Sequence, residues 1–339
     1  MINFNDIGSW HFVSELDVIQ VTAASNVAVT ITAADGAVVL DGTYIAVNGE
    51  VRIYGLHRLL SPLIPESVAD FKLTVGSATK TVHVVQCRID TDEGASQWLT
   101  AHFLTTVTTE RDTALDRKEL LTVLPTETAV PDVTATAEYY NGSSVVSANH
   151  TLASNLPSGK TTEVDVSAAS LADAALGELV AYTVTCGKRA LRYRVAMLPT
   201  ARYAFLLRNN FGAWEALYFT GSTDFDPEYS RESAVIKGRL SVYDLEETAV
   251  MKAHTGPMRP SGVALALDAA RCRELLLLED GKIGDAVGVT AVDVKHSTAD
   301  DDIRDFTFTW RREAVLSAKL EKPKKIPKLF DSTFDDTYN

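Results

Sequence analysis

The residues that most often bind metals or transfer protons are scattered along this chain. Five of its histidines lie on different predicted elements, and they are His57, His102, His150, His254 and His296. No HxH or HxxxH spacing places two imidazoles on one face, as a zinc site requires. An aspartate run at 300–302 with Asp305 suggests a calcium loop, but it lacks the alternating ligands, glycine and glutamate of an EF-hand. We therefore predict structural histidines and no metal site.

Acidic residues offer a second kind of chemistry, because two carboxylates can hydrolyse a glycosidic bond. Candidates are Glu246 with Glu247 and the run DFDPEYSRE at 224–232. A net charge of -13 makes such acidic loops common, and no convergent pair is defined. Walker, GxSxG and dinucleotide-binding glycine motifs are also missing. We expect no catalytic residue and no cofactor, and thus a protein that is not an enzyme.

Three tryptophans are candidates for aromatic contacts with a ligand. Flat indole faces stack on sugar rings, so Trp98, Trp214 and Trp310 could form a carbohydrate platform. Each of them also lies in an alternating pattern typical of a strand, which favours packing in a core or an interface. Packing is the preferred interpretation, and a carbohydrate-binding or host-surface-binding module remains the alternative.

Composition limits the remaining classes. A chain of 339 residues with 46% hydrophobic residues predicts two or three domains. The acidic balance argues against nucleic acid, which needs clustered Lys and Arg. Apolar runs stay below the roughly 18 residues of a membrane span, and the N-terminus has no signal-peptide pattern. Cys87, Cys186 and Cys272 are predicted to be small buried hydrophobes, so we expect a chain made in the cytosol and not inserted in a membrane.

Short β-type runs separated by turn residues predict a mainly β protein. Residues 1–90 are expected to form an antiparallel sandwich with a short helix at 56–63 and a hairpin about Gly76-Ser77. Its other strands are expected at 17–22, 27–32, 37–41, 43–47 and 51–54. After a linker at 89–96, residues 97–198 predict a second sandwich. Its strands are expected at 98–109, 118–123, 135–140, 144–152, 161–166, 179–186 and 190–197.

Residues 199–321 are expected to form a β-rich third domain. Strands at 202–207 and 214–220 predict a hairpin, because Asn209-Asn210-Phe211-Gly212 tolerates positive φ and can reverse the chain. A helix is expected at 261–272. The other strands are expected at 233–242, 247–252, 274–279, 287–296 and 305–311. Residues 322–339 are too polar for a core, and we expect an extended arm that docks on a neighbour through Leu329, Phe330, Phe334 and Tyr338.

Several stretches of the third domain resemble tail proteins encoded by phages and prophages of Bacteroides-type bacteria. The stretches are FLLRNNFGAWEALYFTG, DLEETAVMKAHTGPM, LLLLEDGKIGDAVGVTAVDVKHSTADDDIRDFTFTWR and LFDSTFDDTY. The block that ends in DFTFTWR is similar in style to the β-domains of distal tail and tail-tip proteins, which form rings under a tail tube. The resemblance implies a structural subunit in a virion tail, near the baseplate, which assembles into a homo-oligomeric ring and contacts other tail proteins. A host glycan is a further partner that this location allows. The resemblance brings no catalytic residue with it.

Overall fold

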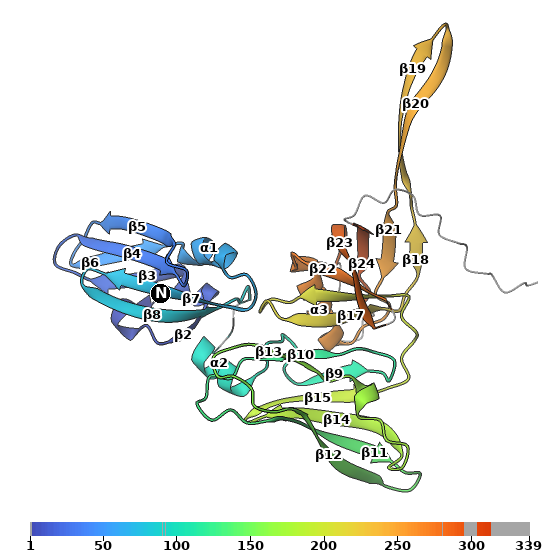
Figure 1. Ribbon diagram of the computed structural model, residues 1–339, viewed down its shortest axis with the longest axis horizontal. Coiled ribbons are helices and arrows are strands. Elements are labelled where there is room, and N and C mark those ends of the chain that lie inside the picture. Colours follow the sequence, from blue (N-terminus) through green and yellow to red (C-terminus); the bar gives the residue numbers. More distant parts are fainter. Residues whose placement is uncertain (1, 90, 92, 280, 295–303, 313–339) are drawn as a thin grey trace, which may run out of the picture.

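The computed structural model describes residues 2–89, 91, 93–279, 281–294 and 304–312. The protein is 51% strand and 13% helical, so it is mainly β, as the sequence predicts. Among the described residues, three hydrophobic cores lie one in each group of sheets, and two smaller clusters combine residues of more than one group. Figure 1 shows these groups in blue, green and yellow-to-red, and we call them the first, second and third domains.

The first domain packs two sheets face to face. The sheets are β1-β3-β6 and β2-β8-β7-β4-β5. Their bounds are β1 Ile2–Asn3, β2 Trp10–Phe12, β3 Val18–Thr22, β4 Val27–Ala33, β5 Val38–Tyr44, β6 Glu50–Tyr54, β7 Val68–Val75 and β8 Ala78–Val85. The helix α1 (Leu56–Leu60) lies against the core with Leu56 and Leu60 buried. Alternate side chains of each strand supply the core, which is why the period-two pattern predicts this region well.

Two expectations for the first domain are wrong. The two strands expected at 37–41 and 43–47 are the single strand β5, because Gly42 continues the ladder opposite Val29 in place of a turn. Strand pairing is also not simply consecutive and antiparallel, since β1 pairs in parallel with β3 and β2 pairs in parallel with β8. These pairings join segments distant in sequence, which local patterns do not specify.

The second domain packs a five-stranded sheet against a two-stranded one. The orders are β12-β11-β14-β15-β9 and β10-β13. Their bounds are β9 Glu110–Thr113, β10 Leu120–Val123, β11 Val133–Tyr140, β12 Val145–Ala153, β13 Thr162–Asp165, β14 Glu178–Cys186 and β15 Arg189–Val195. The strand β9, which the sequence pattern does not predict, adds in parallel to β15.

The strand expected at 98–109 is wrong, because this segment begins with the helix α2 (Ala95–Ala101). Ala95 and Leu99 are both buried, and a spacing of four residues puts them on one helical face. The backbone N–H of Ala95 donates to Oε1 of Glu15 in the first domain, at 2.6 Å. The side chain of Arg189 donates to the carbonyl of Leu99 at the other end. Contacts from two domains thus stabilise a helix that is too short to be stable alone.

The third domain is a curled seven-stranded antiparallel sheet with one helix. Its order is β17-β16-β22-β23-β24-β21-β18. The bounds are β16 Tyr203–Arg208, β17 Trp214–Phe219, β18 Thr223–Phe225, β21 Met251–His254, α3 Pro260–Arg271, β22 Leu275–Glu279, β23 Lys282–Asp293 and β24 Thr307–Arg312. The expected β16–β17 hairpin and helix α3 are confirmed. Phe205, Phe219, Phe308 and Trp310 pack edge to face inside the curl.

A further hairpin leaves the third domain between β18 and β21. It consists of β19 (Glu228–Ile236) and β20 (Arg239–Thr248), which pair only with each other among the described residues. Figure 1 shows it extending away from the rest of the molecule. Our expectation of one strand at 233–242 is wrong, because Lys237 and Gly238 both have positive φ and reverse the chain in a two-residue turn.

Candidate functional site

The turn between β16 and β17 is where the three domains meet. Its residues Asn209-Asn210-Phe211-Gly212 belong to a loop, yet Asn209, Asn210 and Phe211 are at most 2% exposed. Loops are normally solvated, and burying this one requires partners for each polar group. We call this turn, with the side chains that contact it, the junction.

Both the oxygen and the nitrogen of the Asn209 side-chain amide are hydrogen-bonded. Its Oδ1 accepts from the backbone N–H groups of Phe211 and Ala213 at 2.9 and 3.0 Å, which shapes the reversal. Its Nδ2 donates to the carbonyl of Leu104 in the second domain at 2.8 Å and to Oε2 of Glu215 at 2.6 Å. One buried amide therefore shapes the loop and joins two domains.

A buried ion cluster lies beside that amide. Nη1 of Arg111, from the second domain, lies 2.7 Å from Oε1 of Glu215 in the third, and Nη2 lies 3.5 Å from Oε2 of Glu119. The hydroxyl of Thr105 also donates to Glu215, at 2.7 Å. Burial by itself lowers the pKa of Arg111, but the attraction of the two carboxylates outweighs it and the pKa is raised. Burial also raises the pKa of Glu119.

A second carboxylate contacts the turn from helix α3. Asp268 is 2% exposed and accepts hydrogen bonds from the side chain of Asn210 and, at 3.0 Å, from the hydroxyl of Thr106. Burial, together with the negative charge of Glu215, raises the pKa of Asp268 to about 7. This group therefore changes its protonation near neutral pH inside an interface between domains.

The other half of the turn contacts the first domain. The ring centroid of Phe211 lies 5.8 Å from that of Phe12 and 5.6 Å from that of Trp98 on α2. Gly212 has a φ of +73°, and a Cβ placed there would lie 2.2 Å from the carbonyl oxygen of Glu66. Only glycine combines this conformation with so close a backbone approach. The junction thus holds all three domains together, and its groups are occupied with one another.

Unlike the buried junction, the projecting hairpin (residues 228–248) exposes apolar side chains to solvent. Its cross-strand pair Val235 and Leu240 is 71% and 74% exposed, and Val242 is 53% exposed. Lys237 and Arg239, which flank Gly238 at the turn, are also exposed. An isolated two-stranded hairpin is marginally stable in water at best, and exposed strand edges pair readily with other chains. This hairpin has the properties of a binding element.

The three tryptophans lie in three different clusters. Trp98 lies on α2 rather than on a strand, and it packs with Phe211. Trp214 is half-buried, with the guanidinium of Arg208 4.2 Å from its ring centroid. Trp310 is 1% exposed in the third core. The predicted role of these rings in contacting a ligand stays a prediction, although they share no common surface.

The remaining predicted site residues are the arm, the acidic runs and the histidines. The arm residues Leu329, Phe330, Phe334 and Tyr338 lie outside the described residues, as do His296 and the aspartate run at 300–302. Glu246 and Glu247 lie on β20, where their side chains are not described. His57, His83 and His11 each lie within 2.8 Å of a carboxylate, from Asp17, Asp70 and Glu15. Among the described residues, no three His, Cys, Asp or Glu side chains are grouped as metal ligands.

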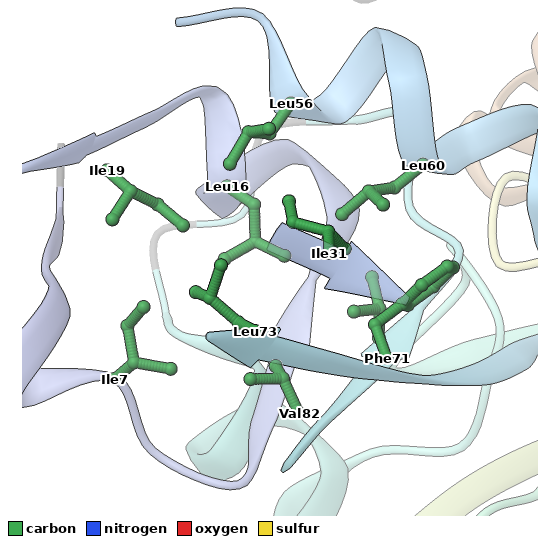
Figure 2. Close-up of a pocket in the computed structure, with 10 residues that line it drawn as sticks. Ile7, Leu16, Ile19, Ile31, Leu56, Leu60, Phe71, Leu73 and Val82 are labelled. Carbon is green, nitrogen blue, oxygen red and sulfur yellow. The ribbon is translucent and has the colours of Figure 1, made fainter. Parts of the chain in front are cut away.

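The pocket in Figure 2 is a small gap in the first core. Apolar side chains such as Ile19, Ile31, Leu60 and Leu73 point into it from both sheets and from α1. The volume of this cavity is about 20 Å³, which is room for roughly one water molecule. A cavity with this size and lining is a packing gap without the polar groups that orient a substrate. In the described part of the chain, no helix is both long and apolar enough to span a membrane.

Comparisons with known proteins give no family for this chain. No protein-family model matches it, and a search of curated proteins finds no match. The functional argument therefore depends on the junction and the projecting hairpin.

Local sequence patterns indicate the central turn but not that it is buried or that it joins the domains. The run Asn209 to Gly212 is recognisable as a reversal. Asp268, which contacts the turn, and Arg111, which pairs with Glu215 beside it, lie far away in sequence and carry no local signal. The projecting hairpin has a weak signal because Lys-Gly is a less common turn pair than Asn-Gly. Its one clue in the sequence is the positive-φ capacity of Gly238.

Proposed function

We propose that this protein is a structural subunit of a phage tail, at or near the baseplate or tail tip, that assembles with further copies of itself and with other tail proteins. The observation that carries the proposal is the projecting hairpin of β19 and β20. It exposes strand edges and the apolar residues Val235 and Leu240 to solvent. Such an element gains stability only when another protein covers it.

The junction supports the same proposal by a second argument. A subunit that bears load in a large assembly must keep its domains in fixed relation while its exposed elements bind neighbours. The pair of Arg111 and Glu215 and the buried ring of Phe211 fix the domains by contacts that a flexible linker would not provide. The chain therefore combines a fixed body with one extended binding element, a combination suited to assembly and not to turnover of a substrate.

The sequence resemblance to distal tail and tail-tip proteins supplies the particular assembly. It concerns the third domain, which includes the β16–β17 hairpin and the strands beside the projecting hairpin. The stretches that carry the resemblance end at Gly221 and resume at Asp244, so they flank the projecting hairpin and overlap only the end of β20. The virion tail is the proposed location.

The test is the mass of the purified protein by light scattering, for the full chain and for two shortened forms. One form replaces residues 228–248 by a Gly-Gly turn between Pro227 and Ala249, and the other ends before residue 322. We expect a defined oligomer for the full chain, monomer for the form without the hairpin, and an unchanged thermal unfolding midpoint for the body. Mass spectrometry of purified tail particles should detect the chain. A protein that is monomeric at all concentrations and missing from particles would refute the proposal.

A further inference from the structure

The tip of the projecting hairpin is basic and apolar, which is unusual in a chain with a net charge of -13. Residues 233–242 (SAVIKGRLSV) contain Lys237 and Arg239 and no acidic residue. Both basic residues are exposed, beside the exposed Val235 and Leu240. A partner that covers this tip should offer an open strand, apolar side chains and negative charge.

The first domain offers these three features at one place, the outer strand β5. This strand ends its sheet, and within the part of the chain that the structure describes it pairs with β4 alone. Val38 is 63% exposed on it, and Ile45 and Val47, which follow it directly, are 72% and 64% exposed. We call residues 38–47 the β5 edge.

Residues 23–51, which include the β5 edge, carry only negative charge. They contain no Lys or Arg and three acidic residues, which are Asp35, Asp41 and Glu50, and Glu50 is paired with Arg52 at 3.1 Å. Asp41 is exposed on β5 itself. Opposite charges at an edge raise the rate of encounter and help select the partner.

Two other outer strands fit the tip less well. The outer strand β12 of the second domain has no Asp, Glu, Lys or Arg between 141 and 159. The edge strand β18 is only three residues long, and the nearby carboxylate of Asp226 is already paired with Lys252 at 2.7 Å. With seven residues, β5 is long enough to pair with most of one strand of the tip.

We propose that the hairpin tip of one copy pairs with the β5 edge of a second copy and extends the sheet of its first domain. This inference rests on the proposed assembly function and names the partner surface for it. The contact joins two different surfaces, so each copy gives a tip and receives another. Repeated contacts of this kind close into a ring or continue as a filament, depending on the rotation between neighbours.

The first experiment exchanges charges between the two surfaces and measures mass by light scattering. The tip variant carries Lys237→Glu and Arg239→Glu, and the edge variant carries Asp41→Lys and Thr43→Lys. Each variant should weaken self-association about ten-fold or more, since like charges then face each other. A chain carrying all four changes should recover it, because opposite charges again meet.

The matched control places Ser147→Lys and Asn149→Lys on β12. Both positions are exposed on an outer strand, and Asn149 accepts a hydrogen bond from Thr136 as Asp41 does from Thr30. We expect this control to self-associate like the unchanged protein. Circular dichroism and thermal unfolding of every variant check that the first domain remains folded.

The second experiment mixes two variants under mild oxidation, and each variant carries one added cysteine. Leu240→Cys at the tip should form a disulfide-linked dimer with Val38→Cys at the β5 edge and not with Val145→Cys on β12. Burial raises the pKa of the natural thiols Cys87 and Cys272 to about 12 and about 11, so their background reaction is slow.

The outcomes separate this inference from the proposed function. If the protein assembles through the hairpin but the edge variant has no effect and no tip-to-edge disulfide forms, the β5 partner is wrong and the assembly function stands. Binding of the tip to a different tail protein in place of a second copy would likewise overturn the β5 partner alone. If the protein never assembles, both the proposed assembly function and the β5 partner are wrong.

Discussion

Nη1 of Arg111 and Oε1 of Glu215 lie 2.7 Å apart, and this buried pair joins the second domain to the third. Its neighbours Thr105 and Asn209 donate to the same carboxylate. Replacing Glu215 by alanine would leave the guanidinium with Glu119 alone, at 3.5 Å. We expect Glu215→Ala to lower the free energy of unfolding by about 3 to 5 kcal/mol, because it leaves a buried charge poorly paired.

Urea unfolding measures that loss, and Glu274→Ala is the control. Glu274 pairs with Arg208 at 3.4 Å but is 52% exposed, so its removal should cost less than about 1 kcal/mol. Equal losses for the two variants would show that the buried pair does not hold the domains together.

The close approach of Gly212 to Glu66 gives a second prediction. Gly212→Ala adds a Cβ 2.2 Å from a carbonyl oxygen in a left-handed conformation, and we expect a loss of at least about 3 kcal/mol. Gly36→Ala has the matching positive φ, +86°, with nothing within 4 Å of the added atom. That control should cost only about 1 to 2 kcal/mol. Thermal unfolding compares them, and similar midpoints would refute the predicted clash.

Protonation of Asp268 gives a third prediction. Its pKa is raised from 3.8 to about 7 in the folded protein, so the folded state holds this proton more tightly than the unfolded state. The stabilisation is complete below pH 4, falls as pH rises towards 7, and is lost above it. Three pKa units correspond to about 4 kcal/mol.

The variant Asp268→Asn isolates this effect from other carboxylates. The new amide keeps one acceptor oxygen for the hydrogen bond from the side chain of Asn210, while its N–H2 group can donate to the hydroxyl of Thr106. We expect the difference in unfolding free energy between the two proteins to change with pH between about 4 and 7. The exposed Asp285→Asn, at a carboxylate outside the junction that pairs with Arg312, is the control for the loss of one charge. A flat difference for Asp268→Asn would mean that the carboxyl titrates normally.

Limited trypsin digestion tests the marginal stability of the projecting hairpin. Among the cleavage sites of residues 2–312, we expect the first cuts after Lys237 and Arg239, since these exposed residues flank an isolated turn. Lys188 is also exposed in a turn, but its strands β14 and β15 lie within a five-stranded sheet. Mass spectrometry of the fragments identifies the order. Early cleavage after Lys188 would contradict the prediction, and assembly should protect the tip.

Local patterns predict those parts of this fold that local contacts determine. The hairpin around Asn209 to Gly212 and the helix α3 follow from turn residues and apolar spacing, and both are confirmed. The helix α2 could not be predicted, since its ends are held by Glu15 of the first domain and by Arg189, about 90 residues further along the chain. Strands paired in parallel, such as β9 with β15, likewise depend on partners distant in sequence.

The candidate site shows the same limit more sharply. The run of residues around Asn209 is recognisable, but its buried state depends on Arg111 and Asp268, whose partners no spacing rule identifies. The hairpin tip has the pattern of one strand because Lys237 is not a usual residue for positive φ. The sequence does contain the charge contrast between the tip and residues 23–51, which acquires meaning only when the structure shows both as open edges.

The position of Phe211 has a consequence for synthesis on the ribosome. Phe12 and Trp98 are made early, but the Phe211 ring that packs against both of them belongs to the third domain. A nascent chain therefore displays an unfinished apolar surface until that late segment emerges. Domains usually fold in order from the N-terminus, and here the earliest one waits for a residue of the last to complete its packing.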